Sequence, residues 1–146
     1  MITLRKIDVY NFAKVIRLEV DESQQDFVTS NAFSLSQAYV MPECRPLAIY
    51  NGMSPVGFAM YALDRDEHEY WVYRLMIDKN HQRKGFGREA MRLLIEHIKK
   101  EAPDRDRLFI SFEPTNEGAK RLYTSLGFVP DNREVDGETV YRLNLR

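Results

Sequence analysis

The sequence predicts a mixed α/β domain built around one central sheet, and three observations lead to this prediction. Its 146 residues match the usual size of one domain with one hydrophobic core. Short apolar runs rich in branched and aromatic residues, typical of strands, alternate with segments of helical periodicity. No repeat, linker or low-complexity stretch divides the chain, so we expect a single domain over residues 1–146.

The first half of the chain is expected to supply two helices and four strands. Apolar side chains recur at helical spacing in two segments, and four short apolar runs read as strands. Two of these runs flank the turn dipeptide Asn51-Gly52, which predicts a hairpin. The expected helices are 9–20 and 24–39, and the expected strands are 2–7, 47–50, 56–63 and 70–77.

The second half is expected to alternate helix, strand, helix and strand. An amphipathic helix with apolar residues from Ala90 to Ile98 ends before Pro103, and a strand follows at 108–112. The next helix ends at Gly127, the usual left-handed exit residue, and residues 140–145 alternate as a closing strand.

Composition excludes several classes of protein. The single cysteine, Cys44, excludes an internal disulfide framework and a cysteine-rich zinc site, and the three histidines lack metal-ligand spacing, so no metal is expected. The net charge of −1 gives no global field for nucleic acid. Neither a membrane-length apolar run nor a secretory leader is present in the sequence, so we expect no membrane partner and a cytoplasmic location.

The glycine-containing segment Gln82-Arg83-Lys84-Gly85-Phe86-Gly87-Arg88 lies between an expected strand and an expected helix. A helix start leaves about four backbone N–H groups without internal partners, and the helix dipole adds roughly half a positive charge. Glycines let the backbone approach a ligand closely, and three basic side chains surround them. These features favour a pyrophosphate site over a plain strand-to-helix turn with chance basic residues.

The segment also partly fits two other kinds of phosphate-binding loop, but both interpretations are weaker. Residues 85–90 also fit the loose dinucleotide pattern G-x-G-x-x-A, but only about 56 residues follow, too few for the rest of such a fold. No acid closes the next expected strand at the usual interval of about 20 residues, since Glu113 comes later. A P-loop would require lysine and a hydroxyl residue where Arg88 and Glu89 stand.

With a second motif, the sequence resembles the GNAT superfamily of acyl-CoA N-acetyltransferases. The family pattern Q/R-x-x-G-x-G/A is matched by Gln82, Gly85 and Gly87. The later pattern N-x-x-A-x-x-L-Y-x-x-x-G-F is matched at Asn116, Ala119, Leu122, Tyr123, Gly127 and Phe128. The resemblance covers nearly the whole chain and implies the GNAT fold, a mostly antiparallel sheet of about six to seven strands flanked by about four helices.

The resemblance is closer to the bacterial spermine/spermidine acetyltransferases. The run Arg74-Leu75-Met76-Ile77-Asp78 is similar to their R-F-M-I-D, residues 24–38 to their second helical region, and Asp136-Gly137-Glu138 to their closing hairpin. The function implied is acetyl transfer from acetyl-CoA to a primary amine of a polyamine, by direct attack in a ternary complex. The alternatives are another amine (an aminoglycoside, an amino acid or a protein N-terminus) or a non-catalytic acyl-CoA-binding module.

The resemblance also implies where acetyl-CoA, as co-substrate, would lie. The main chain of Met76 and Ile77 would bond the pantetheine amides, and Asn116 would meet the pantetheine arm. Lys120 would approach the terminal phosphate. The pyrophosphate would be held by the glycine segment, namely Gln82, Arg83, Lys84, Gly85, Phe86, Gly87 and Arg88.

Tyr123 is the residue expected to act in the chemistry, by hydrogen-bonding or protonating the departing thiolate. A tyrosine pKa of about 10 against about 8.5 for a thiol makes full transfer uphill by roughly 2 kcal/mol. A shared hydrogen bond, or a modestly lowered tyrosine pKa, is therefore expected.

The general base and the acceptor site are less defined. Many relatives place a glutamate on the fourth strand, whereas residues 70–74 here contain no carboxylate. Glu113, or a water chain past Tyr73, is a candidate base. Glu19 and Asp21 follow the first helix, which borders the acceptor groove in this fold, and their charge suits a polyamine. The resemblance also implies a homodimer.

Overall fold

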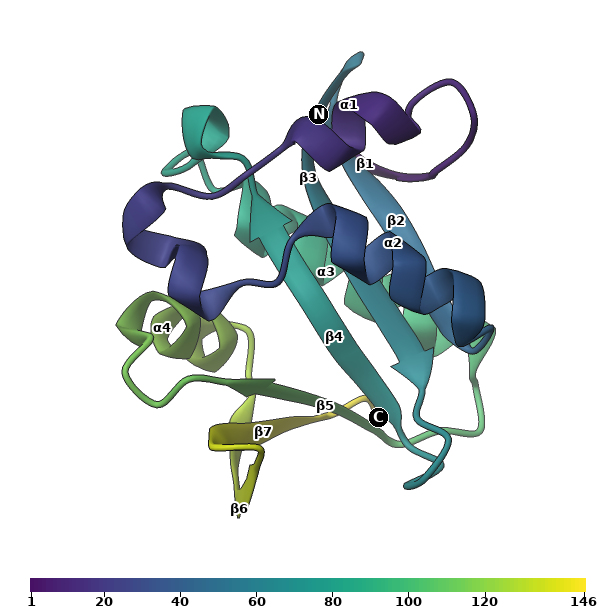
Figure 1. The fold of residues 1–146 in the computed structure, drawn as a ribbon. Helices are drawn as coiled ribbons and strands as arrows, with labels where there is room; N and C mark the ends of the chain where they lie inside the picture. The colour runs from purple at the N-terminus through teal and green to yellow at the C-terminus, as the bar shows by residue number, and fades with distance from the viewer.

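The computed structural model describes all residues, 1–146, as a seven-stranded sheet with helices on both faces (Figure 1). The strands are β1 (Ile2–Lys6), β2 (Cys44–Asn51), β3 (Ser54–Leu63), β4 (Tyr70–Ile77), β5 (Arg107–Phe112), β6 (Val129–Val135) and β7 (Glu138–Asn144). The α-helices are α1 (Phe12–Arg17), α2 (Asn31–Val40), α3 (Phe86–Glu101) and α4 (Glu117–Ser125), and two 3-10 helices are η1 (Glu22–Phe27) and η2 (Lys79–His81).

The sheet has the order β1-β2-β3-β4-β5-β7-β6. All neighbouring strands are antiparallel except β4 and β5, which are parallel. Helices α1 and α2 cover one face, here called the α2 face, and α3 covers the other, the α3 face (Figure 1). This is the mixed α/β fold expected from the sequence.

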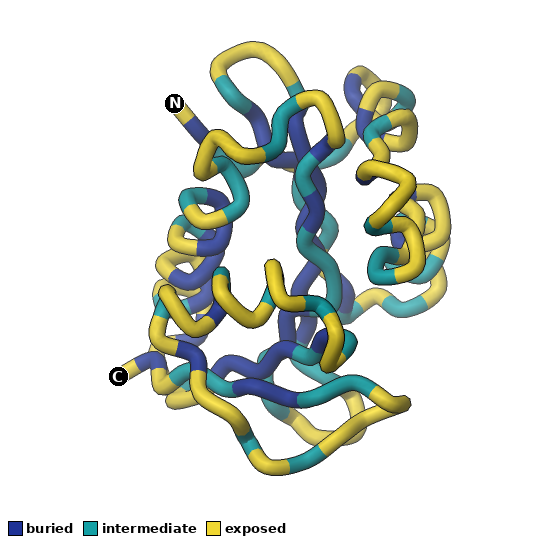
Figure 2. Tube along the Cα trace, turned by 90° about the vertical axis from the view of Figure 1, so that its left-hand side faces the viewer, coloured by how far each residue is buried: buried dark blue, intermediate teal, exposed yellow.

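The core consists of apolar layers on both faces of the sheet (Figure 2). On the α3 face, one side of α3 is buried, including Met91, Leu94 and Ile98, at the spacing that its sequence predicts. On the α2 face, Val15 of α1 packs with Phe58 and Met60 of β3. Burial of both faces explains why β3 is an almost continuous apolar run.

The segment expected as one helix over 24–39 is two elements. The 3-10 helix η1 ends at Phe27, and Val28 and Ser30 have extended backbone before α2 begins at Asn31. The Ser30 side chain accepts a hydrogen bond from the backbone N–H of Phe33 at 3.2 Å, so it caps α2. The helix expected over 9–20 is likewise shorter, Phe12–Arg17.

The periodicity of the sequence does not predict strand β6, which the structure contains. Its residues are mostly exposed because it lies at the edge of the sheet, and its register with β7 is irregular between Pro130 and Glu134. Without a buried face, no apolar alternation marks it. The hairpin to β7 turns through Asp136 and Gly137, both with positive φ.

Candidate active site

The two parallel strands β4 and β5 separate part-way along their length. They pair only from Tyr70 to Val72 of β4 and from Leu108 to Ile110 of β5. Beyond these pairs both strands continue but diverge, which Figure 1 shows as a V that opens toward α4 and η1. The backbone groups of β4 that face this opening have no partner on β5, so an extended ligand could add to the strand edge there.

A β-bulge in β4 lies at the point of divergence. Met60 of β3 pairs with Arg74 and Tyr61 pairs with Val72, so Tyr73 is the extra residue. A bulge bends its strand and changes which face the following side chains occupy. As a result Arg74 turns to the α2 face, where its guanidinium donates to Ser34 Oγ and Gln37 Oε1 at 3.1 and 2.9 Å.

A cavity of about 750 Å³ occupies the opening. Its walls come from both sides of the sheet, because residues of η1 and residues of α3 and α4 contribute to it. It is lined by residues of five regions: Val20, Ser23, Gln24, Phe27 and Val28; Leu75, Met76 and Ile77; His81, Gln82, Arg83, Gly85, Phe86, Gly87 and Arg88; Phe112 and Thr115; Asn116, Glu117, Gly118, Ala119, Arg121, Leu122 and Tyr123.

The glycine segment forms one end of this cavity. Gly85 is the N-cap of α3 with φ +79°, and Arg83 also has a positive φ, +64°. These two left-handed residues bend the chain so that the free N–H groups of the first turn of α3 face the cavity. Arg83 and Arg88 line it and form no ion pair, whereas Lys84 is exposed and does not line it.

The Gln82 side chain has partners within the protein. Its Nε2 donates to the carbonyl oxygen of Ile77 at 2.9 Å and to Gln24 Oε1 at 2.8 Å. Gln82 therefore links the glycine segment by hydrogen bonds to the end of β4 and to η1. These hydrogen bonds hold the two walls of the cavity at a set separation.

Tyr123 of α4 lies at the inner wall of the cavity. The residue is 6% exposed and packs against Phe112 and Phe128, with ring centroids 5.7 and 5.6 Å away. Its hydroxyl forms no hydrogen bond within the protein and is open to the cavity. Burial raises the pKa of Tyr123 above its ordinary value. This is opposite to the lowered pKa considered from the sequence, so of the two expected possibilities only the shared hydrogen bond agrees with the structure.

Comparison with known proteins agrees with this geometry. Residues 9–128 match the model of the Acetyltransferase (GNAT) family. The chain belongs to the GNAT acetyltransferase family.

Its similarity to individual GNAT proteins extends over nearly its full length. It is 32% identical to a probable spermine N(1)-acetyltransferase of Bacillus subtilis subsp. natto, and 31% identical to a spermine/spermidine N(1)-acetyltransferase of Bacillus subtilis strain 168. Both alignments cover 95% of each chain. The solved spermidine N-acetyltransferase of Vibrio cholerae, in complex with CoA and spermine, has a TM-score of 0.75 at 15% identity, over 99% of this chain and 95% of that one. The last similarity shows the shared fold.

Most residues at the start of α4 line the cavity. Asn116 lines the cavity, and its Oδ1 also caps α4 by accepting from the N–H of Ala119 at 3.1 Å. Lys120 is exposed and does not line the cavity, whereas the neighbouring Arg121 does. Motif matching missed Arg121, and helical spacing does not single it out, because Lys120 follows the lining residue Asn116 by the same four residues.

The acidic residues expected at the acceptor site do not line this cavity. Glu19 pairs with Lys79 at 2.9 Å and borders a neighbouring hollow of about 330 Å³, which shares Val20, Val28 and Met76 with the cavity. Asp21 caps η1 by accepting from the N–H of Glu22 at 2.8 Å. Glu113 is half-buried beyond the end of β5.

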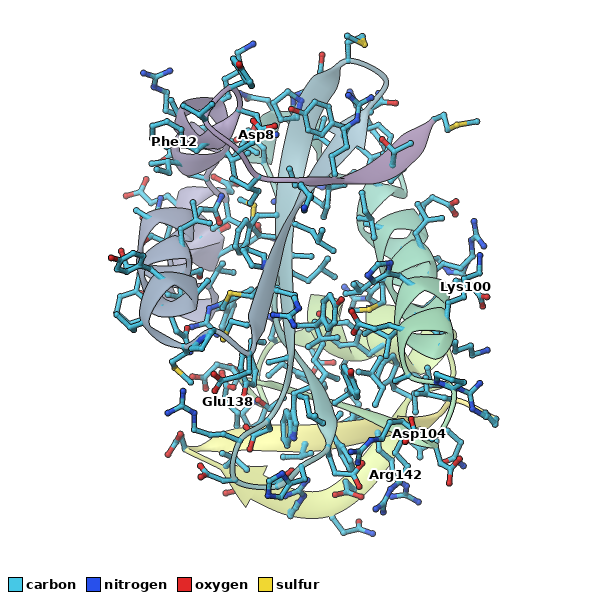
Figure 3. All side chains as sticks on the ribbon, turned by 90° about the vertical axis from the view of Figure 1, so that its right-hand side faces the viewer. Asp8, Phe12, Lys100, Asp104, Glu138 and Arg142 are labelled. Atoms are coloured by element: carbon cyan, nitrogen blue, oxygen red, sulfur yellow. The ribbon has the colours of Figure 1, made fainter.

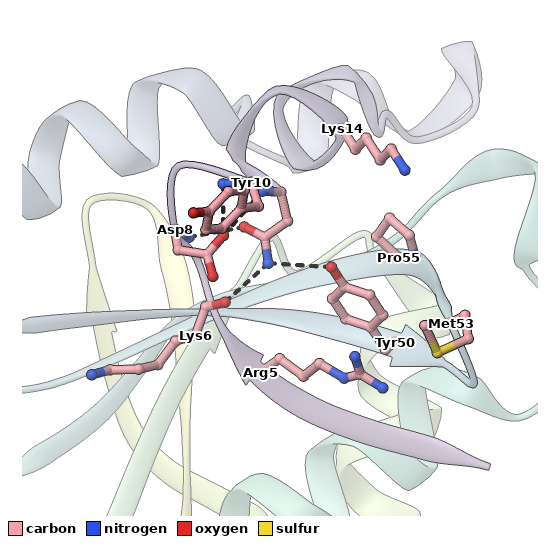
Figure 4. Close-up of a pocket in the computed structure, with 9 residues that line it drawn as sticks. Arg5, Lys6, Asp8, Tyr10, Lys14, Tyr50, Met53 and Pro55 are labelled. Carbon is pink, nitrogen blue, oxygen red and sulfur yellow. Dashed lines mark hydrogen bonds between the residues drawn. The ribbon is translucent and has the colours of Figure 1, made fainter.

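A further hollow of about 300 Å³ lies between β1, α1 and the β2–β3 turn (Figure 4). Its polar groups hold the β1–α1 turn together. Asp8 and Asn11 exchange side-chain to backbone hydrogen bonds, and Asn11 Nδ2 donates to Tyr50 Oη at 3.2 Å and to the carbonyl oxygen of Lys6 at 3.0 Å. We therefore assign this hollow a structural role. No helix of the protein has the length and apolar character needed to cross a membrane.

Proposed function

We propose that this GNAT protein transfers the acetyl group of acetyl-CoA to a primary amine of a polyamine, such as spermidine or spermine, by direct attack in a ternary complex. The observation that carries acetyl transfer is the cavity between β4 and β5, which joins the N-terminus of α3 to the Tyr123 hydroxyl. The polyamine acceptor is supported by the relatives named as spermine and spermidine acetyltransferases, at 31 and 32% identity over 95% of the chain.

The residues of the cavity fit acetyl-CoA. An anionic pyrophosphate suits the N-terminus of α3, where Arg83 and Arg88 add positive charge. The pantetheine amides suit the free edge of β4 at Met76 and Ile77, because that edge offers unpaired backbone donors and acceptors. When bound, acetyl-CoA supplies an acetyl group activated as a thioester.

Tyr123 then stabilises the leaving group, the thiolate of CoA. Its phenol donates a hydrogen bond to the CoA sulfur as negative charge develops there. Since burial raises the pKa of Tyr123, the phenol keeps its proton at neutral pH. Moving that proton fully to a thiolate costs more than the roughly 2 kcal/mol between ordinary pKa values, so stabilisation by hydrogen bonding is favoured.

The acceptor amine must lose a proton before it attacks. At an amine pKa of about 10.4, roughly one molecule in a thousand is neutral near pH 7.4. β4 has no carboxylate to take the proton, and the Tyr73 hydroxyl is already engaged, since it donates to Asp64 Oδ2 at 2.6 Å. We propose that water removes the proton, with Glu113 as the protein base to test.

A second acceptor class has one observation in its favour. The half-buried guanidinium of Arg74 has no carboxylate partner, and it lies on the face of the sheet that a GNAT acceptor would approach. A cation at that place suits an amine that also carries a carboxylate, such as an amino acid.

The decisive experiment measures thiol release from acetyl-CoA with a panel of amines. The panel contains spermidine, spermine, putrescine, several amino acids, an aminoglycoside and a peptide with a free N-terminus. We expect the highest kcat/KM with spermidine or spermine. Preference for an amino acid would assign Arg74 to the acceptor carboxylate, and absence of release with every amine would favour a non-catalytic acyl-CoA-binding module.

A further inference from the structure

A carboxylate and a hydroxyl lie together on the α2 face, beside the opening between the strands. Ser111 of β5 donates a hydrogen bond from Oγ to Glu138 Oε1 of β7 at 2.8 Å. Ser111 pairs with Val140, which packs with Trp71 and Phe109 on the α2 face. Since strand side chains alternate, Glu138 occupies the same face as Val140, and Figure 3 shows Glu138 on the side of α2.

This pair borders the part of the sheet where β4 and β5 diverge. Ile110 is the last residue of β5 that pairs with β4, so Ser111 is the first residue of β5 beyond the paired region. On β4 the corresponding residue is Tyr73, the extra residue of the bulge. The cavity on the α3 side of this point contains Tyr123 and Phe112, so Glu138 and Tyr123 lie on opposite sides of one opening.

The carboxylate of Glu138 has no cation within ion-pair distance. Asp131, another acid of the hairpin, pairs with Arg133 and Arg142, but Glu138 forms no ion pair. The one cation of β4, Arg74, donates instead to α2 and to the carbonyl oxygen of Tyr73. Burial lowers the pKa of the Arg74 guanidinium, and the nearby Cys44 and Glu138 oppose this effect.

We propose, building on the polyamine acetyltransferase function above, that Glu138 binds an ammonium group of the acceptor on the α2 face and that Ser111 holds the carboxylate in position. A half-buried carboxylate without a cationic partner attracts an ammonium group more strongly than an exposed one, because solvent screens it less. The site supplies the acceptor-side carboxylate that β4 lacks. Glu138 is a substrate-binding residue in this assignment, and Ser111 is a positioning residue.

The rival carboxylate is Glu113. It stands beyond the end of β5, and no side-chain hydrogen bond of the protein orients it. An oriented carboxylate loses less conformational entropy when it binds a ligand. The geometry therefore favours Glu138.

The test compares E138Q and S111A with E113Q and with the matched control E134Q, which removes one exposed carboxylate from the same hairpin. We expect E138Q to raise the KM for spermidine roughly ten-fold or more, because a charge-assisted hydrogen bond is lost, with the KM for acetyl-CoA unchanged. S111A should raise the KM for spermidine less, and E134Q should leave it unchanged.

An unchanged KM for spermidine in E138Q, an equal rise in E134Q, or a rise in E113Q alone would overturn the assignment of Glu138. Stabilisation by CoA in a thermal-shift assay shows that each variant is folded, and if E138Q fails this check, S111A against E134Q decides. Wild-type protein without activity on any polyamine would refute the proposed function and Glu138 with it. Active wild type with an unaltered E138Q would refute Glu138 alone.

Discussion

At the scale of single residues, Tyr123 combines core packing with the chemistry proposed for its hydroxyl. The ring contributes to the core through Phe112 and Phe128, while the hydroxyl at its tip is open to the cavity. Core packing fixes the ring, so the hydroxyl is positioned before any ligand binds. The price of this position is a raised pKa, which makes the phenol a hydrogen-bond donor rather than an acid at neutral pH.

Tyr123→Phe removes the donor and keeps the ring. We expect kcat to fall ten-fold or more, because the developing thiolate loses its hydrogen bond, while acetyl-CoA affinity stays nearly constant. Steady-state kinetics with spermidine and titration with CoA measure the two quantities. Turnover equal to that of the wild type would remove Tyr123 from the mechanism.

At the scale of elements, two neighbouring basic residues of α4 have different surroundings. Arg121 lines the cavity, whereas the neighbouring Lys120 is exposed and does not. A motif gives positions along the chain, whereas the burial of Leu122 and Tyr123 sets the rotation of the helix.

Arg121→Ala and Lys120→Ala form a matched pair that tests this rotation. We expect Arg121→Ala to raise the KM for acetyl-CoA several-fold, because a cation near the anionic end of the ligand is lost, and the effect should shrink at high salt. Lys120→Ala should have almost no effect. A larger effect at Lys120 would show that the cofactor lies closer to Lys120 than to Arg121.

The sequence predicts elements well where one face of the element is buried. It predicts them poorly where a capping hydrogen bond sets the end of a helix or where a strand lies at the edge of the sheet. β4 and the start of α4 follow from their residues, since apolar side chains and the N-cap Asn116 mark them. The break at Ser30 depends on a capping hydrogen bond within a run of helical periodicity, and edge strand β6 has no buried face. Both required the three-dimensional structure.

The residues of the candidate site likewise form two groups: those that the sequence predicts and those that only the structure reveals. Motifs predict the glycine segment and Tyr123 as site residues, because such motifs are local in the sequence. The bulge at Tyr73, the contact between Ser111 and Glu138 and the cavity side of Arg121 depend on pairing between distant segments. No local sequence pattern indicates which distant segments pair with each other.

At the scale of the whole molecule, the backbone pairing of the sheet is incomplete at the opening between β4 and β5. A seven-stranded sheet that pairs β4 with β5 over only three residues of each leaves a backbone edge without internal partners. This edge is sustained by a rigid frame: β3 pairs with β4 on one side and β7 with β5 on the other. A ligand that supplies the missing hydrogen bonds should therefore stabilise the protein. Dimerisation, in contrast, stays a prediction of the family resemblance.

Hydrogen exchange with and without CoA tests whether the opening is the cofactor site. At 100 times its Kd, a ligand that binds only the folded state adds about 2.7 kcal/mol, which corresponds to a rise in Tm of roughly 5–10 °C for a chain of this size. We expect slower exchange for the amides of residues 73–77 and for the first turn of α3. The amides of β2 serve as the internal control for local effects, because β2 lies between β1 and β3, away from the opening. Slowing of exchange confined to other strands would place CoA elsewhere, because only the unpaired edge of β4 gains backbone partners from a ligand in the V.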